Sequence, residues 1–215
     1  MRCVDRAFVA GLILLTTGVA GCATPLPPAS AGGAGSSARA PRESALQVSP
    51  AVRREFADAL RAMKLGRYRE AEAALLPLTH ASPELSGPYA NLGIVYFRLG
   101  KLPEAAGALK KAIAINPGQA AYYNQLGIVY RQSGQFDDAR GAYAKALQID
   151  PDYPNAHLNL GILYDMYLED FDQALQHYER YQDLQPSADA QVTKWIVDLK
   201  NRHQLAAKTA KRNSE

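Results

Sequence analysis

Apolar residues along most of this 215-residue chain recur at intervals of three and four. This spacing places side chains on one face of an α-helix, whereas recurrence at every second position would be typical of half-buried strands. Leu92 and Tyr96, for example, lie four residues apart and share a helical face with Gly93. Pro117, Pro151 and similar residues follow such segments at points where a helix has to end. The pattern predicts an all-α fold.

The helical pattern repeats with a period of 34 residues. The segment from Tyr89 to Tyr96, which reads YANLGIVY, recurs as YNQLGIVY at 123–130 and as HLNLGILY at 157–164. A weaker copy lies upstream, because Gly66, Gly100 and Gly134 are also 34 residues apart. The last copy departs from the others in its turn at 168–170, which is one residue longer and lacks the glycine.

These motifs resemble the tetratricopeptide repeat (TPR), a helix-turn-helix unit of the same period and residue order. The resemblance implies a TPR α-solenoid, a right-handed superhelix of antiparallel helix pairs in which terminal repeats are atypical. We expect a TPR domain over 46–205, with repeats at about 52–85, 86–119, 120–153 and 154–188. A capping helix is expected at 188–202, beginning after Ser187 and sealed by Trp195, followed by a basic disordered tail at 206–215.

The repeated small and aromatic residues predict how the helices pack. Gly93, opposite Ala105 on the partner helix, permits two backbones to approach closely. The tyrosines at the equivalent positions 96, 130 and 164 are expected to fill the space between neighbouring helix pairs.

The N-terminal segment is typical of an export signal. Arg2 and Arg6 precede an uncharged stretch, residues 7–21, that is too short for a spanning helix. The stretch ends in Val19-Ala20-Gly21-Cys22, which resembles the lipobox of bacterial lipoproteins. The resemblance implies removal of residues 1–21 and attachment of lipid to Cys22, with an ordinary secretory signal as the alternative.

A linker is expected between the lipidated cysteine and the repeats. Residues 23–45 contain 18 Ala, Pro, Gly or Ser residues among 23, a composition that cannot bury a core, so 22–45 is predicted to be a flexible tether. In lipoproteins of Gram-negative bacteria an aspartate after the cysteine favours retention in the inner membrane. Ala23 occupies that position, so the resemblance predicts the periplasmic face of the outer membrane.

Charge and chemistry exclude several classes of function. With 24 Lys and Arg against 21 Asp and Glu, the chain is too nearly neutral for a typical nucleic-acid-binding protein. Its two cysteines provide neither a disulfide framework nor a four-ligand zinc site. The four histidines are scattered, His157 is expected to be a packed ring, and no phosphate loop or nucleophile motif occurs. We predict no enzymatic activity, no cofactor and no metal.

A ligand-binding groove is the predicted functional site. In TPR proteins the first helices of the repeats line a concave groove, and the residues flanking the Leu-Gly pair face it. Primary amides can bond to a peptide backbone, isoleucines supply apolar contact, and arginines can pair with a carboxylate. The expected groove residues are Asn91, Ile94, Arg98, Asn124, Gln125, Ile128, Arg131, Asn159 and Ile162. The alternative is a solvated polar face without a dedicated ligand.

Charge is also graded along the repeats. Residues 154–188 carry one basic and six acidic side chains, whereas the segment from 189 carries six basic and three acidic ones. The acidic repeat is therefore expected to attract either a basic partner segment or the chain's own tail.

These expectations combine into a function. The resemblance to lipidated TPR proteins suggests an outer-membrane scaffold that binds an envelope protein or peptide and assists pilus or secretin assembly, in the manner of a pilotin. The alternative is an adaptor for peptidoglycan synthases or hydrolases. A third class, an enzyme of glycan metabolism, is disfavoured because no acid/base constellation is present.

Overall fold

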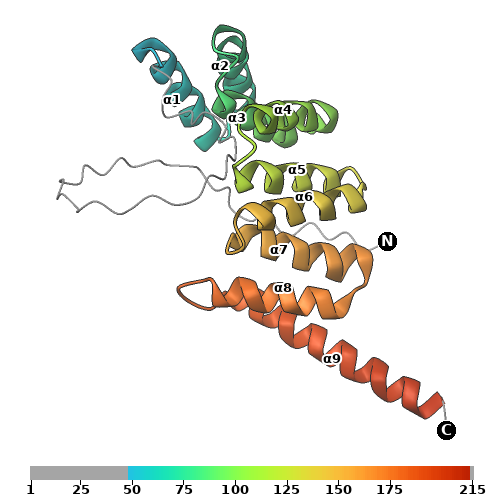
Figure 1. Ribbon diagram of the computed structural model, residues 1–215. Helices are drawn as coiled ribbons and strands as arrows, with labels where there is room; N and C mark the ends of the chain where they lie inside the picture. Colours follow the sequence, from blue (N-terminus) through green and yellow to red (C-terminus); the bar gives the residue numbers. More distant parts are fainter. Residues whose placement is uncertain (1–47, 214–215) are drawn as a thin grey trace, which may run out of the picture. The chain divides into compact units, whose positions relative to one another are not determined.

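The computed structural model describes residues 48–213. The predicted signal peptide, Cys22 and the linker 22–45 lie outside the described residues. Within them the chain forms helices and no strand, which confirms the all-α prediction (Figure 1). The elements are α1 (Pro50–Lys64), α2 (Tyr68–Ala81), α3 (Ser86–Arg98), α4 (Leu102–Ile115), α5 (Ala120–Gln132), α6 (Phe136–Ile149), α7 (Pro154–Leu163), the π-helix η2 (Tyr164–Leu168), α8 (Phe171–Asp183) and α9 (Ala190–Asn213).

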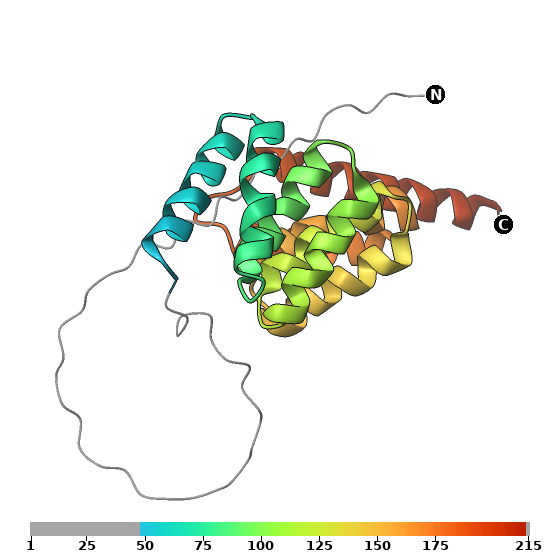
Figure 2. The ribbon, with the colours of Figure 1, turned by 90° about the horizontal axis from the view of Figure 1, so that it is seen from above.

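The helices pack as successive pairs in chain order. α1 packs on α2, α3 on α4, α5 on α6 and α7 on α8, and the second helix of each pair also contacts the first helix of the next (Figures 1 and 2). α9 follows as a single helix against α8. The first helices α3 and α5, and likewise α5 and α7, touch one another directly. This arrangement is the α-solenoid that the 34-residue period predicts.

Glycine permits the close approach of the two helices in each pair. A Cβ atom added to Gly93 would lie 2.6 Å from Leu109 Cγ and 3.2 Å from the carbonyl oxygen of Ala105. At Gly127 and Gly161 the added atom would lie 2.5 Å from the rings of Tyr143 and Tyr178. The predicted close contact is therefore confirmed, and its nearest partner is the side chain four residues after the small alanine.

The repeated tyrosines join neighbouring parts of the core. Tyr96 packs against the apolar cluster around Leu75 and also against the next cluster, around Leu109. Tyr130 and Tyr164 each contact two successive clusters in the same way. These rings fill the space between helix pairs, as predicted.

The helix starts agree only partly with the sequence. Ser49 caps α1 as expected, since its side chain accepts a hydrogen bond of 3.2 Å from the amide of Val52. The expectation for Ser187 was wrong, because α9 begins at Ala190 and Asp189 provides the cap. The Asp189 carboxylate accepts bonds of 2.8 and 3.2 Å from the amides of Gln191 and Val192. An aspartate caps a helix at least as well as a serine does, and this one lies directly before the first turn.

The turn of the last repeat takes an unpredicted form. Gly66, Gly100 and Gly134 occupy the turns of the first three repeats with φ between 72° and 77°. In the fourth repeat the extra residue is absorbed by η2, and Glu169 takes the left-handed conformation with φ of 54°. A side chain at such a φ is uncommon and costs about 1–2 kcal/mol relative to glycine.

The C-terminal helix is longer than expected. α9 runs to Asn213, past residue 202, and most of the predicted disordered tail is helical. Val192 and Leu199, each 1% exposed, are buried against Tyr178 and Tyr181 of α8. Trp195 lies against the same cluster, with its ring 5.6 Å from that of Tyr178, in agreement with its predicted role as the residue that seals the end of the solenoid.

Candidate protein-binding face

The first helices of successive repeats bring the predicted amides to one side of the solenoid. Asn91 on α3, Gln125 on α5 and Asn159 on α7 are 34 residues apart and half-buried. Because α3 touches α5 and α5 touches α7, these residues lie on adjacent helices at equivalent positions. We call the surface that carries Asn91, Gln125 and Asn159 the A-helix face.

The three amides differ in how far the fold already uses them. Asn91 Nδ2 donates a hydrogen bond of 2.9 Å to the carbonyl oxygen of Gly87 on its own helix. Asn159 Nδ2 donates to Asn124 Oδ1 at 3.0 Å and so links α7 to α5. Gln125 makes no side-chain hydrogen bond with any of the described residues. Its donor and acceptor are thus available to a ligand at the centre of the A-helix face.

Two of the predicted groove residues are buried, which corrects their assignment. Asn124 is 2% exposed, because its side chain is turned toward α7 and bonded to Asn159. Ile162 is 7% exposed and belongs to a cluster with Val192 and Leu199 of α9, which covers that end of the solenoid. Neither side chain can contact a ligand directly.

The remaining isoleucines are half-buried. Ile128 packs at the edge of the cluster formed by Leu160 and Leu163, so it serves the junction between repeats as well as the surface. Ile94 is half-buried at the equivalent position of α3. Both keep part of their apolar surface on the outside.

The predicted arginines are only partly available. Arg131 Nε donates to the hydroxyl of Tyr143 at 3.4 Å, and its guanidinium lies 5.9 Å from the ring centre of Tyr167. Burial raises the pKa of Tyr143, while the positive charge of Arg131 acts in the opposite direction. Arg131 is therefore held between aromatic side chains. Arg98 is half-buried in the last turn of α3.

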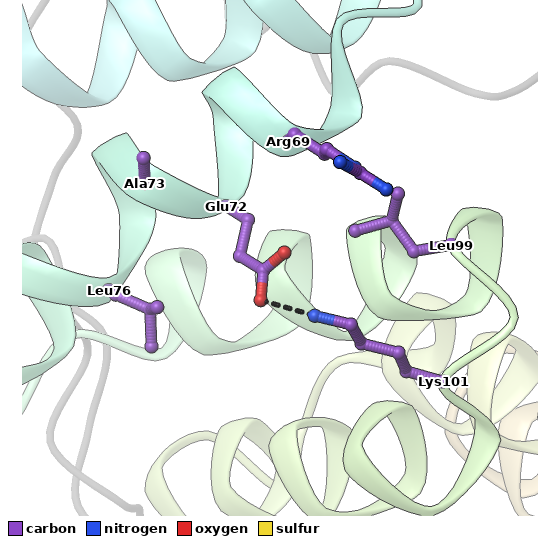
Figure 3. Close-up of a pocket in the computed structure, with 6 residues that line it drawn as sticks. All are labelled: Arg69, Glu72, Ala73, Leu76, Leu99 and Lys101. Atoms are coloured by element: carbon purple, nitrogen blue, oxygen red, sulfur yellow. Dashed lines mark hydrogen bonds and ion pairs between the residues drawn. The ribbon is translucent and has the colours of Figure 1, made fainter.

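A cavity that the sequence analysis did not predict lies at the junction of the first two repeats. It has a volume of about 470 Å³ and is open to solvent. Figure 3 shows its lining, in which the carboxylate of Glu72 meets the ammonium of Lys101 at 2.7 Å. The hydrogen bond to Glu72 raises the pKa of Lys101. The other lining residues are Arg69, Ala73, Leu76 and Leu99.

A comparison between repeats could have identified this cavity. One period further along the chain, Ala106 and Gln135 replace Glu72 and Lys101. The charged pair is thus particular to the first junction. Because the two charges already satisfy one another, the cavity offers a ligand less unpaired chemistry than Gln125 does.

His157 is a packed ring, as expected, and it forms a pair with another histidine. It is 8% exposed, its Nδ1 lies 3.0 Å from His177 Nδ1, and its Nε2 lies 3.0 Å from the carbonyl oxygen of Pro151. His177 stacks on Tyr164 with ring centres 5.7 Å apart. Burial, and secondarily the charge of His157, lowers the pKa of His177 to about 4.

The acidic repeat is occupied by the chain's own C-terminal helix. Arg202 lies 2.7 Å from Asp165, and Lys200 lies 2.8 Å from Glu179 of α8. His203 approaches Asp172 at 3.9 Å. Of the two occupants expected from the charge gradient, the structure thus places the chain's own tail there.

Other chemistry was searched for in the same region. Among residues 48–213, no three His, Cys, Asp or Glu side chains gather in a way that could hold a metal ion. In that part of the chain no helix combines the length and apolar character needed to cross a membrane.

Comparison with known proteins agrees with the fold. Family profiles described as "TPR repeat" match residues 93–134 and 127–166, and one described as "Tetratricopeptide repeat" matches 155–188. No curated protein matches the sequence.

Similar solved structures are also TPR proteins. A thermophilic TPR protein of Thermus thermophilus is 26% identical with a TM-score of 0.61, covering 69% of this chain and 80% of that one. The pilF protein of Pseudomonas aeruginosa is 21% identical with a TM-score of 0.65, covering 74% and 72%. YrrB, described as a TPR protein with an unusual peptide-binding site, is 23% identical with a TM-score of 0.58, covering 69% and 75%.

The class of protein follows from these observations. The chain carries tetratricopeptide repeats, and its described residues form a TPR α-solenoid. Proteins of this fold generally act as scaffolds that bind other proteins or peptides.

Proposed function

We propose that this protein is a lipid-anchored scaffold of the bacterial envelope whose A-helix face binds an extended segment of another envelope protein. The single observation that carries the binding proposal is the state of Gln125. Its half-buried amide has no hydrogen bond among the described residues and stands between two equivalent amides that the fold already orders.

The chemistry of this face suits a peptide backbone. A peptide presents N–H and C=O groups at regular intervals, and a primary amide can donate to one and accept from the other. Gln125 can make both bonds, while Asn91 retains its Oδ1 as an acceptor. The exposed parts of Ile94 and Ile128 add apolar contact for alternate side chains of the ligand.

The anchoring proposal depends on the sequence before the repeats. The lipobox-like segment ending at Cys22 supplies the attachment, and Ala23 favours delivery to the periplasmic face of the outer membrane. Labelling the full chain with radioactive palmitate in cells tests it. The wild-type chain should incorporate the label and float with outer membranes, whereas Cys22→Ser should do neither.

A role in pilus or secretin assembly is the more specific part of the proposal. It is supported by the resemblance to lipidated TPR proteins and by the similarity of fold to the pilF protein of Pseudomonas aeruginosa. Deleting the gene should remove assembled secretin multimers or surface pili and leave the cell wall composition unchanged. A change in wall composition with normal pili would instead indicate an adaptor for peptidoglycan enzymes.

A further inference from the structure

The C-terminal helix α9 has two faces, of which the fold uses one. Val192 and Leu199 are buried against α8, and Trp195 and Ile196 pack beside them. Figures 1 and 2 show the C-terminal part of α9 extending past the other helices. The helix is therefore attached along its first half, while its outer side and its second half face solvent.

The outer face of α9 combines basic and apolar side chains. At 100° per residue, positions 194, 197, 201, 205, 208 and 212 fall on the side opposite Val192 and Leu199. All six side chains are exposed, namely Lys194, Val197, Asn201, Leu205, Lys208 and Arg212. Val197 and Leu205 are 54% and 63% exposed, which is unusual for large apolar residues of this fold. This set is called the α9 outer face.

The charges of this face are not neutralised within the protein. Lys200 and Arg202 pair with acidic residues of the last repeat, whereas Lys194, Lys208 and Arg212 form no ion pair with any described residue. The nearest carboxylate on the helix, that of Asp198, lies 3.0 Å from Arg202. The α9 outer face therefore presents positive charge alone, together with two apolar side chains about 12 Å apart along the helix.

An anionic bilayer surface fits this combination. Basic residues on a helix are attracted to acidic headgroups, and apolar side chains on the same face enter the boundary between headgroups and acyl chains. A second copy of α9 is a poor occupant, because symmetric pairing would bring the lysines of both copies together. We propose that α9 lays its outer face on anionic phospholipids and so holds the repeats against the bilayer.

This proposal rests on the proposed membrane location and is independent of the A-helix face. It gives the protein a second, reversible contact with the membrane in addition to the predicted lipid. One acyl chain alone holds a protein only marginally, so contacts of this kind add to the strength and orientation of anchoring.

Vesicle binding by the chain from residue 46 tests the proposal without the lipid. All core clusters of the described structure consist of residues within 52–199, so this chain contains the contacts that form the fold. Binding should be at least about tenfold tighter to vesicles with one-third phosphatidylglycerol than to pure phosphatidylcholine, and it should fall with added salt.

Matched variants locate the contact. The triple variant Lys194→Gln, Lys208→Gln, Arg212→Gln should weaken binding to the anionic vesicles by about a hundredfold, and Leu205→Asn by a smaller factor. The control Lys64→Gln, Lys111→Gln, Lys145→Gln removes the same charge from exposed positions on α1, α4 and α6 and should bind like the wild type.

Three results would overturn the proposal. These are equal binding to both kinds of vesicle, an equal loss in the control variant, or a concentration-dependent dimer in solution that Leu205→Asn abolishes. The last result would assign the face to a second copy. None of them bears on Gln125, so the proposed binding function stands or falls by a separate measurement.

Discussion

Arg202 of α9 donates a hydrogen bond of 2.7 Å to Asp165 at the end of the last repeat. The Asp165 carboxylate is only 12% exposed and also accepts a bond of 3.4 Å from the hydroxyl of Tyr178. Burial, and then the negative charge of Asp165, raises the pKa of Tyr178. This carboxylate thereby connects the π-helix η2, α8 and α9, and it directs toward the chain's own terminus a charge that would otherwise attract a basic partner.

Removing this charge should loosen the C-terminal cap. We expect Asp165→Asn to lower the free energy of unfolding by about 1–3 kcal/mol, because a nearly buried charged hydrogen bond is lost. The control is Asp152→Asn, which removes the exposed partner of Arg180 and should cost about 0–1 kcal/mol. Urea denaturation followed by circular dichroism measures both. Equal effects would show that Asp165 acts as an ordinary surface charge.

The close approach at Gly127 gives a second prediction. A Cβ atom there would lie 2.5 Å from Tyr143 Cε1, so Gly127→Ala should force the buried ring to move and destabilise the protein by about 1–3 kcal/mol. Gly141→Ala on α6 is the matched control, since nothing lies within 4 Å of its added atom. That variant should gain up to about 1 kcal/mol from helix propensity. Thermal unfolding should separate the two substitutions in sign.

The turn of the fourth repeat offers a stabilising substitution. Glu169 has φ of 54°, so Glu169→Gly should relieve strain and stabilise the protein by about 1 kcal/mol. In the third repeat the reverse change, Gly134→Ala at φ of 74°, should cost about the same amount. If Glu169→Gly proves destabilising in a chemical denaturation experiment, the glutamate side chain has a role that the backbone does not explain.

The histidine pair makes stability depend on pH. The pKa of His177 is about 4 in the folded protein against 6.5 ordinarily, so the unfolded state binds more protons between these values. Stability should be constant above about pH 7.5 and should fall by about 1–2 kcal/mol as the pH drops toward 4, the partly exposed ring feeling less than the full shift.

The His177→Gln variant should lose this part of the pH dependence, whereas His80→Gln, at an exposed position, should retain it. Unfolding midpoints measured from pH 4 to 8 provide the comparison. Parallel curves for wild type and His177→Gln would contradict the assignment.

Much of the fold could be predicted because the repeat imposes the same physical constraint several times. A residue without a side chain at Gly93, Gly127 and Gly161 is needed wherever two helices cross closely, and tyrosines are needed wherever two pairs meet. Each constraint leaves a residue at a fixed interval in the sequence. The period therefore predicted the α-solenoid and its main packing contacts correctly.

Features that occur once could not be predicted in this way. The longer turn near Glu169 was visible in the sequence, but its absorption into a π-helix depends on how Asp165 and Tyr178 pack. The buried state of Asn124 depends on a bond to Asn159 in the next repeat. The length of α9 was underestimated because its second half is polar, which favours a frayed tail when only burial is considered.

The central claim, that the A-helix face binds a protein segment, is tested most directly by site-specific photocrosslinking in living cells. A photoreactive amino acid at Gln125 samples the A-helix face, and the same amino acid at Gln148, which is exposed on α6, samples the opposite helices as a matched control. We predict a discrete adduct with one envelope protein from position 125 and none from position 148. The same adduct from both positions, or none from position 125, would contradict the account.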